Sequence, residues 1–284
     1  MAVELLIRDG SPDWWESPDI WVVPGTDPGG APGMPVVGEP AYLWATVRNQ
    51  GDLQASQVQV DFWVANPSLQ IRKSTANHIG TAFADIAAGG SQDVLCLVPW
   101  QVTLINGGHE CVVVEASSPA DPLSPPPADP DVLDAPAYRQ IAQRNLSVLV
   151  VSGMIRGEVL VSVCAGARAD KTAVIEVAQG DALSAEVLGS LGLKGRRYAG
   201  ADRIAAGLSE RSLCGQEGAE GARALRLRVP RGTCAPAYLG VAARERLAPG
   251  EYAVIKVVER DQERVIGGLS VVIVQADDRE GGAQ

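Results

Sequence analysis

The stretch EPAYLWATVRNQGDLQASQVQVDFWVANPS, residues 39–68, contains two runs in which every second side chain is apolar. These apolar positions are Leu43, Ala45, Val47, Val58, Val60, Phe62 and Val64. Because successive side chains of a β-strand point to opposite faces, each run predicts a strand with one face in a core. Gly51 and Asp52 lie between the runs and predict a turn.

Short apolar segments of the same kind recur along the whole chain. They are residues 81–86, 93–98, 110–116, 146–152, 171–178, 223–229, 251–260 and 265–274. The last two flank residues 261–264 and predict a compact hairpin. Regularly spaced short strands with turn signals between them are typical of β-sandwiches. The sequence therefore predicts an all-β fold.

Two parts of the second half qualify this pattern. In residues 223–229 the leucines and Val229 should face a core, while Arg226 and Arg228 point outward. Residues 181–211 carry a helical stripe of apolar side chains that is interrupted by five glycines, which disfavour a long helix. We expect a short helical or irregular insertion there.

Length and composition indicate two domains. The chain has 284 residues, more than the usual single-domain size of about 100 to 200 residues. Residues 1–147 contain 6 Lys and Arg against 17 Asp and Glu, giving −11, and residues 148–284 contain 18 against 17, giving +1. All six tryptophans lie in the first hundred residues. These shifts place a boundary near residue 147, and the acidic first half disfavours nucleic acid as a partner.

The hydropathy pattern bears on location. No apolar run approaches the roughly 18 residues that span a bilayer, so no transmembrane segment is expected. Residues 1–30 carry acids and prolines where a signal peptide needs a basic start and an apolar stretch. We expect a cytoplasmic protein, with export by a specialised route as the alternative.

Residues 117–140 contain seven prolines and cannot cross a sheet interior. Four aspartates in this segment are candidate calcium ligands: Asp121, Asp129, Asp131 and Asp134. Their spacing is not that of an EF-hand loop, and a solvated proline-rich connection is the favoured interpretation. No cofactor and no other metal site is expected.

Three segments together carry a resemblance to a known family. YLWATVRNQGDLQASQVQVDFWVANPS, GGHECVVVEA and IAQRNLSVLVV follow one another in the order R-N-x-G, W-x-A-x-P, G-H-x-C and Q-R-N. This order resembles bacterial immunoglobulin-like modules of the CARDB type, which are related to cell adhesion. The resemblance covers residues 18–152 and implies an immunoglobulin-like β-sandwich there. The second half, with its Pro-Gly-Glu-Tyr step into the closing hairpin, resembles another immunoglobulin-like sandwich in architecture, so we expect two tandem sandwiches. The expected division is a Trp- and Pro-rich arm (1–17), a CARDB-like sandwich (18–152), a second sandwich (153–276) and a flexible tail (277–284).

The resemblance also implies where two tryptophans lie. It places the two opening strands in opposite sheets, with Trp44 and Trp63 outward on opposite surfaces. A plain hairpin would instead set Trp44 beside Trp63 on one face. Trp14, Trp15 and Trp21 could cover one of these rings as a lid, or join an aromatic patch that binds a partner.

Few side chains suggest chemistry. His109 and Cys111 share a face if their segment is a strand, with Glu115 further along, so a Cys/His hydrolase is a conceivable but disfavoured function. The five cysteines are odd in number and lack the spacing of a metal site, so free buried thiols are the default interpretation. In an exported protein Cys214 could instead pair with Cys234.

A basic cluster completes the candidate sites. Lys194, Arg196 and Arg197 could meet the acidic first half of another copy in a head-to-tail contact. The sequence thus favours a non-catalytic binding or assembly module that acts through adhesin-like protein contacts. A structural subunit of a filament or of a phage-tail-like assembly is the first alternative.

Overall fold

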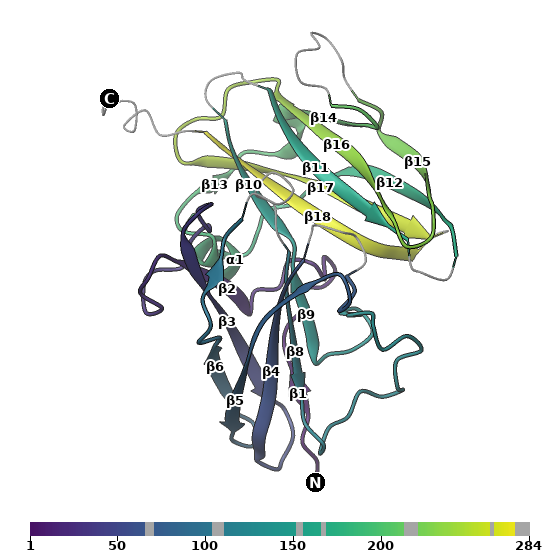
Figure 1. The fold of residues 1–284 in the computed structure, drawn as a ribbon. Helices are drawn as coiled ribbons and strands as arrows, with labels where there is room; N and C mark the ends of the chain where they lie inside the picture. The colour runs from purple at the N-terminus through teal and green to yellow at the C-terminus, as the bar shows by residue number, and fades with distance from the viewer. Residues whose placement is uncertain are drawn as a thin grey trace. The chain divides into compact units, whose positions relative to one another are not determined.

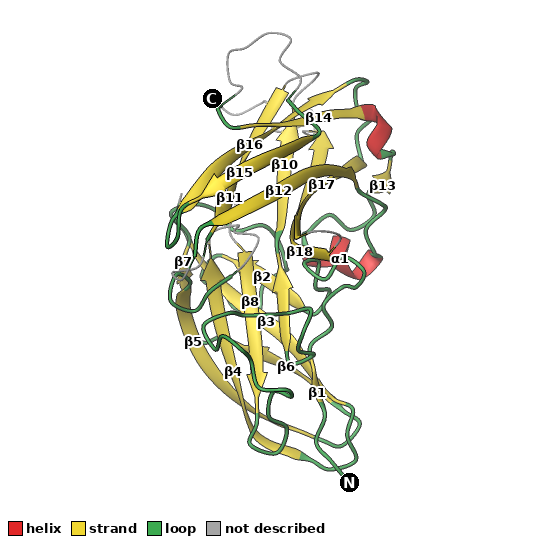
Figure 2. Cartoon of the chain, turned by 90° about the vertical axis from the view of Figure 1, so that its right-hand side faces the viewer, coloured by secondary structure: helices red, strands yellow, loops and turns green. Residues whose placement is uncertain are grey.

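A computed structural model describes residues 1–65, 71–103, 111–151, 156–165, 169–212, 221–261 and 264–275. Nearly all of its regular structure is β-strand (Figures 1 and 2), which confirms the all-β prediction. The expected tail (277–284), His109 and Cys214 lie outside the described residues.

The chain divides into two compact units. Unit 1 contains the described residues up to Asn145 together with residues 186–194, and unit 2 contains the remaining described residues from Leu146 onward. The boundary therefore follows Asn145, close to the composition shift and earlier than the expected residue 152.

Unit 1 is built from two sheets that share one hydrophobic core. Its strands are β1 (Leu5–Leu6), β2 (Ile20–Pro24), β3 (Pro40–Asn49), β4 (Ala55–Ala65), β5 (Asn77–Ile86), β6 (Ser91–Leu95), β7 (Trp100–Gln101), β8 (Cys111–Ser117) and β9 (Ile141–Arg144). In the first sheet β3 pairs with β1 and β2, and also with β6 and β7. The second sheet has the order β5-β4-β8-β9. Apolar side chains of both sheets form a single cluster between them.

The two opening strands behave as the resemblance implied. β3 and β4 lie in different sheets, so the plain hairpin is wrong. Trp44 lies opposite Trp21 and Leu95, whereas Trp63 lies opposite His78 and Val113. All seven alternating apolar side chains of the opening stretch are buried, which confirms the predicted core faces.

The first residues belong to the sheet and do not form a separate arm. β1 pairs with β3, and Val3, Leu5 and Ile7 are buried in the core of unit 1. The expected arm (1–17) therefore supplies part of the core.

Unit 2 also has two sheets around one core. Its strands are β10 (Leu146–Val151), β11 (Arg156–Cys164), β12 (Lys171–Gln179), β13 (Arg197–Tyr198), β14 (Ile204–Ser209), β15 (Ala224–Val229), β16 (Cys234–Ala243), β17 (Glu251–Asp261) and β18 (Arg264–Gln275). One sheet has the order β10-β18-β17-β12-β15, with β13 beside β17, and the other has the order β11-β16-β14. β17 and β18 form the predicted hairpin, and β15 buries Leu227 and Val229 while Arg226 and Arg228 are exposed.

Strand β10 belongs to unit 2, whereas the sequence predicted it in the first sandwich. β10 was expected to close the first sandwich, but it pairs in parallel with β18 of unit 2. Alternation specifies which face of a strand is buried and not which strand becomes its neighbour, so the apolar pattern of residues 146–152 fits either unit.

The predicted helical or irregular insertion (181–211) is only partly so, because residues 197–198 and 204–209 of it form β13 and β14. It contains the helix α1 (Ala185–Ser190) and a 3₁₀ turn (Ala201–Arg203). Residues 186–194 pack with unit 1, although the strands before and after them belong to unit 2.

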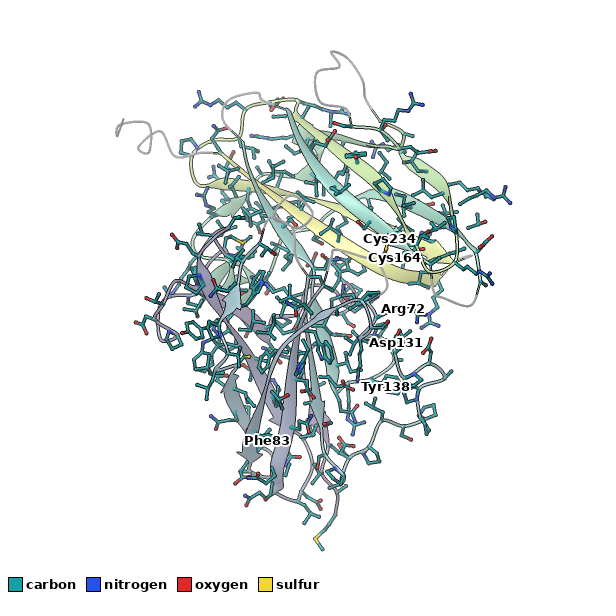
Figure 3. All side chains as sticks on the ribbon, viewed as in Figure 1. Arg72, Phe83, Asp131, Tyr138, Cys164 and Cys234 are labelled. Atoms are coloured by element: carbon teal, nitrogen blue, oxygen red, sulfur yellow. A yellow bond between two sulfur atoms is a disulfide. The ribbon has the colours of Figure 1, made fainter. Side chains whose placement is uncertain are left out.

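The alternative pairing of Cys214 with Cys234 does not form, and free thiols, the default interpretation, do not hold for Cys164 and Cys234. Cys234 forms a disulfide with Cys164, its direct neighbour across β11 and β16, with a Cα–Cα distance of 4.0 Å (Figure 3). The two residues are 70 apart in sequence, and a cross-link of this span contributes about 4 kcal/mol to stability in the chain-entropy account. Cys96 and Cys111 are free and buried.

Candidate functional site

The two sheets of unit 1 leave two lateral sides, where their outer strands face each other. On one side β2 and β1 of the first sheet lie beside β9 and β8 of the second. On the other side β6 lies beside β5. We call these the β9 side and the β5 side, and they differ in how the strand edges are covered.

The edge of β9 is paired. Ser17 donates its backbone N–H to the carbonyl of Gln143, and Asn145 donates to the carbonyl of Trp15, at 3.1 and 2.8 Å. Glu16 and Arg144 form an isolated bridge between these bonds. The backbone of residues 15–17 therefore satisfies the edge that β9 would otherwise expose.

A buried arginine reinforces the β9 side. Arg144 donates through Nη1 to the carbonyl of Ile20 and to Ser190 Oγ at 2.8 Å, and through Nη2 to the carbonyl of Ser190 at 3.1 Å. Burial lowers the pKa of Arg144 to about 10. Ser190 is the last residue of α1, where a cation is favoured by the partial negative charge of the free carbonyls. Arg144 thus fastens residues 186–194 to β9 and β2.

An ion-pair network extends this closure. Asp19 is 1% exposed and accepts from Arg8 and Arg48, with its Oδ1 at 2.5 Å and 3.0 Å from their Nη2 atoms. Burial by itself would raise the pKa of Asp19, but the hydrogen bonds from the two arginines outweigh it and the pKa is lowered. Arg8 also reaches Glu186 of α1 at 3.1 Å.

The R-N-x-G motif has a structural role. Arg48 binds Asp19, while the side-chain oxygen of Asn49 accepts from the backbone of Glu4 and Gly51, each at 3.1 Å. Gly51 lies so close to the N-terminal segment that a Cβ would stand 2.1 Å from the carbonyl oxygen of Ala2. These motif residues join the N-terminal segment to β3.

The β5 side is open by comparison. β5 pairs with β4 alone among the described strands, so its other edge has no strand neighbour there. Phe83 of β5 is 61% exposed (Figure 3). Leu97 and Val98, which follow β6, are 77% and 51% exposed. An unpaired strand edge next to exposed apolar side chains is typical of a protein-binding surface.

Polar side chains lie along the outward face of β4 and β5. Asp61 Oδ1 is 3.0 Å from His78 Nε2 and 2.5 Å from Thr81 Oγ1. The Trp63 ring lies against His78 with centroids 4.5 Å apart, and its buried Nε1 has no hydrogen-bond partner among the described residues. This face is therefore an ordered platform beside Phe83.

The other predicted tryptophans are turned to internal contacts. Trp14 and Trp15 are buried and meet edge to face. Trp21 stacks on Trp44 at 5.7 Å, and Trp44 Nε1 donates to the carbonyl of Pro28 at 3.0 Å. The segment before β3 thus covers Trp44, and of the five candidate tryptophans only Trp63 lies next to the open β5 side.

The predicted basic cluster is divided between the units. Lys194 is exposed and belongs to unit 1, whereas Arg196 and Arg197 belong to unit 2. Arg197 binds Glu251 at 2.7 Å. The backbone N–H of Ala248 and then Arg197 lower the pKa of Glu251. Arg197 is therefore already paired within its own unit.

The four candidate calcium ligands do not gather into one site among the described residues. Asp121 accepts from Leu5 N and Arg139, and Asp129 and Asp131 each bind Arg72 at 3.1 Å (Figure 3). In the part of the chain that the structure describes, no group of three or more His, Cys, Asp or Glu residues is placed to hold a metal ion, and Asp134 joins none. The proline-rich segment is instead fixed by arginine–carboxylate pairs.

The thiol of the suggested hydrolase pair is fully buried. Burial raises the pKa of Cys111 well above its usual value. A reactive cysteine needs access and a stabilised thiolate, and Cys111 has neither.

Sequence reasoning missed Phe83, Leu97 and Val98. Phe83 could have been found from the sequence. In a strand it shares one face with the polar residues Thr81 and Asp85, while Ala82 and Ala84 lie on the other face. A large ring at a solvent-facing position indicates a contact surface.

Comparison with known proteins identifies no family. No family model matches the chain, and no curated protein matches it. Among solved structures, a Paenibacillus sp. cycloisomaltooligosaccharide glucanotransferase is 17% identical, with a TM-score of 0.22, over 36% of this chain and 12% of that chain. A family 123 glycoside hydrolase from Clostridium perfringens is 9% identical, with a TM-score of 0.29, over 47% of this chain and 23% of that one.

A third solved structure is matched over nearly its whole length. The CFA/I enterotoxigenic E. coli adhesin CfaE is 9% identical, with a TM-score of 0.26, over 98% of this chain and 94% of that chain. The chain spans less than a quarter of the two carbohydrate-active enzymes. Within the described residues, no helix is long and apolar enough to cross a membrane.

Proposed function

We propose that this protein is a non-catalytic binding or assembly module that acts through protein–protein contacts at the β5 side of unit 1. The observation that carries the proposal is the difference between the two strand edges. The β9 edge is closed by residues 15–17 and by Arg144, whereas β5 has a free edge and an exposed Phe83. A partner strand would gain main-chain hydrogen bonds from that edge and apolar contact from the ring.

We also propose that both units are immunoglobulin-like and that unit 1 is of the CARDB type. The crossing of β3 and β4 between sheets supports this, as does the shared core in each unit. In such a fold the sandwich interior is filled by side chains, which leaves binding to edges and outer faces.

An exported location fits the disulfide better than the cytoplasm does. Cys164–Cys234 would be kept reduced by cytosolic thiols, so we propose a specialised route into an oxidising compartment. Mass spectrometry of protein isolated from its native cells under thiol-blocking conditions should find these two cysteines unlabelled. Complete labelling of both would place the protein in a reducing compartment.

Affinity capture with matched variants tests the binding function. The immobilised full chain should retain a partner from native cells, and Phe83→Lys should reduce that retention at least tenfold, because a charge replaces the apolar contact. Val150→Lys is the matched control, since Val150 is 62% exposed and lies in unit 2. Equal capture by wild type and Phe83→Lys would contradict the proposal.

A further inference from the structure

A second strand edge is available in unit 2. β15 is the last strand of its sheet and pairs with β12 alone among the described strands. Its outward side chains include Arg226 and Arg228, which are exposed and form no ion pair with another described residue. Its inward side chains, Leu227 and Val229, lie in the core of unit 2. β15 is thus a basic edge strand with an apolar inner face.

β5 is complementary in charge. Its sequence NHIGTAFADI has no Lys, Arg or Pro, the residues that often protect an edge from pairing. Asp85 lies on its exposed face, two residues from Phe83. The inward side chains Ala82 and Ala84 pack on the core of unit 1.

The surroundings of β5 make a basic partner favourable. Residues 1–147 contain six basic side chains against 17 acidic ones. All six basic side chains have partners within unit 1: Arg8, Arg48, Arg72, Lys73, Arg139 and Arg144. The field around β5 is therefore negative, and a strand that carries arginines is attracted to it.

We propose that β15 of one copy adds to the free edge of β5 of a second copy, with Arg226 and Arg228 beside Phe83 and Asp85. This inference rests on the proposed binding function and names its partner. The two edges would exchange main-chain hydrogen bonds, and their apolar inner faces would continue the core side of each sheet. Arginine binds both the carboxylate and the face of an aromatic ring.

Charge also selects this pairing over a symmetric one. Two β15 strands side by side would bring arginine against arginine, which is destabilising across a strand pair. The contact between β15 and β5 joins two different surfaces of the chain, so it is heterologous. The dimer still offers one free β5 edge, on the copy that contributes β15, and one free β15 edge, on the other copy, so the association can continue into a linear array.

Sedimentation velocity over a concentration series at two salt concentrations tests the inference. Wild type should form species larger than a dimer at low salt and smaller species at high salt, since screening weakens the ion pairs. Replacing Arg226 and Arg228 by glutamate should weaken self-association by about tenfold or more. The control replaces the exposed Arg231 and Arg244 by glutamate, which changes the net charge from −10 to −14 in both variants.

Charge exchange makes the test specific. Asp85→Arg alone should also weaken assembly, and adding Asp85→Arg to Arg226→Glu and Arg228→Glu in one chain should restore it. A mixture of the Asp85→Arg protein with the doubly substituted arginine variant should assemble beyond a dimer, although neither protein should assemble well alone. In the mixture the two native edges fit each other, and so do the two exchanged edges.

The inference falls if wild type is monomeric throughout the series, or if the glutamate variant assembles like wild type. Phe83→Lys separates this inference from the proposed function. If capture of a partner depends on Phe83 while assembly is unaffected by Arg226 and Arg228, the binding function stands and the identity of the partner is wrong. If Phe83→Lys changes neither capture nor assembly, both proposals are contradicted.

Discussion

The β9 and β5 sides of unit 1 belong to the same sandwich, but the strand edge is covered on the β9 side and uncovered on the β5 side. At β9 the strand edge is paired by residues 15–17, and the buried Arg144 fastens a segment from far along the sequence. At β5 the edge has no strand neighbour among the described residues, and Phe83 points to solvent. The difference teaches that backbone pairing and a buried arginine can close one edge of a sandwich while the edge on the opposite side is left without a strand neighbour among the described residues.

The largest effect should come from Arg144, the centre of the closed side. Arg144→Ala removes the donor to the carbonyls of Ile20 and Ser190, and unsatisfied buried acceptors are costly. We expect the free energy of unfolding to fall by about 4 kcal/mol in urea titrations. Arg244→Ala, at an exposed position, is the control and should change it by less than about 0.5 kcal/mol. Equal effects of the two substitutions would show that Arg144 does not close this side.

Asp19 should have the next largest effect. Asp19→Asn weakens two charge-assisted contacts and should cost about 3 kcal/mol at neutral pH. Because the pKa of Asp19 is lowered by folding, its contribution is present above the unfolded value near 3.9 and is lost as pH falls through the lower folded value. The free energy of unfolding, measured from pH 6 to pH 2, should therefore fall less steeply in the Asn variant than in wild type. Parallel pH profiles for wild type and the Asn variant would show that the Asp19 ion pairs do not stabilise the fold.

The substitution Gly51→Ala, also on the β9 side, should lower the free energy of unfolding by a smaller amount. An added Cβ would meet the carbonyl of Ala2 at 2.1 Å, so Gly51→Ala should push the N-terminal segment away from β3. We expect a loss of about 2 kcal/mol. Gly189→Ala is the control, because nothing lies within 4 Å of the added Cβ. Gly89 is unsuitable, because its φ of +64° would strain any residue other than glycine. A Gly51→Ala protein as stable as the Gly189→Ala protein would contradict the close approach.

The smallest stability effect should be at the open side. Phe83→Lys should change the free energy of unfolding by less than about 0.5 kcal/mol, because the ring is mostly exposed. Its effect should appear in binding and self-association instead. A loss of several kcal/mol would show that Phe83 is a packing residue and that this side is closed as well.

Sequence alone predicted the buried faces of β3, β4 and β15 and the presence of β5, β6, β8, β10, β12, β17 and β18, because a period of two is a local property. It did not predict β11, β14 and β16, which form the second sheet of unit 2. It did not predict that β10 pairs with β18, or that residues 186–194 pack with unit 1, since both depend on which distant segments meet. It did not predict the disulfide between Cys164 and Cys234 for the same reason.

Individual side chains show the same limit at the candidate site. Arg144 follows a polar residue and reads as solvent-exposed in sequence, yet its charge is buried because α1 supplies acceptors from another part of the chain. The sequence predicted outward-facing tryptophan rings as a candidate binding patch, but Trp21 and Trp44 stack on each other across β2 and β3. Phe83 could have been found, because its outward position follows from alternation alone.

Amide hydrogen exchange followed by mass spectrometry tests the contrast between the two sides most directly. At low protein concentration, where copies are separate, we predict fast exchange in β5 and slow exchange in β9 and residues 186–194. Raising the concentration should then slow exchange in β5 and β15 together. Protection of β5 as strong as that of β9 in the separate chain would show that both sides are closed and would contradict the account.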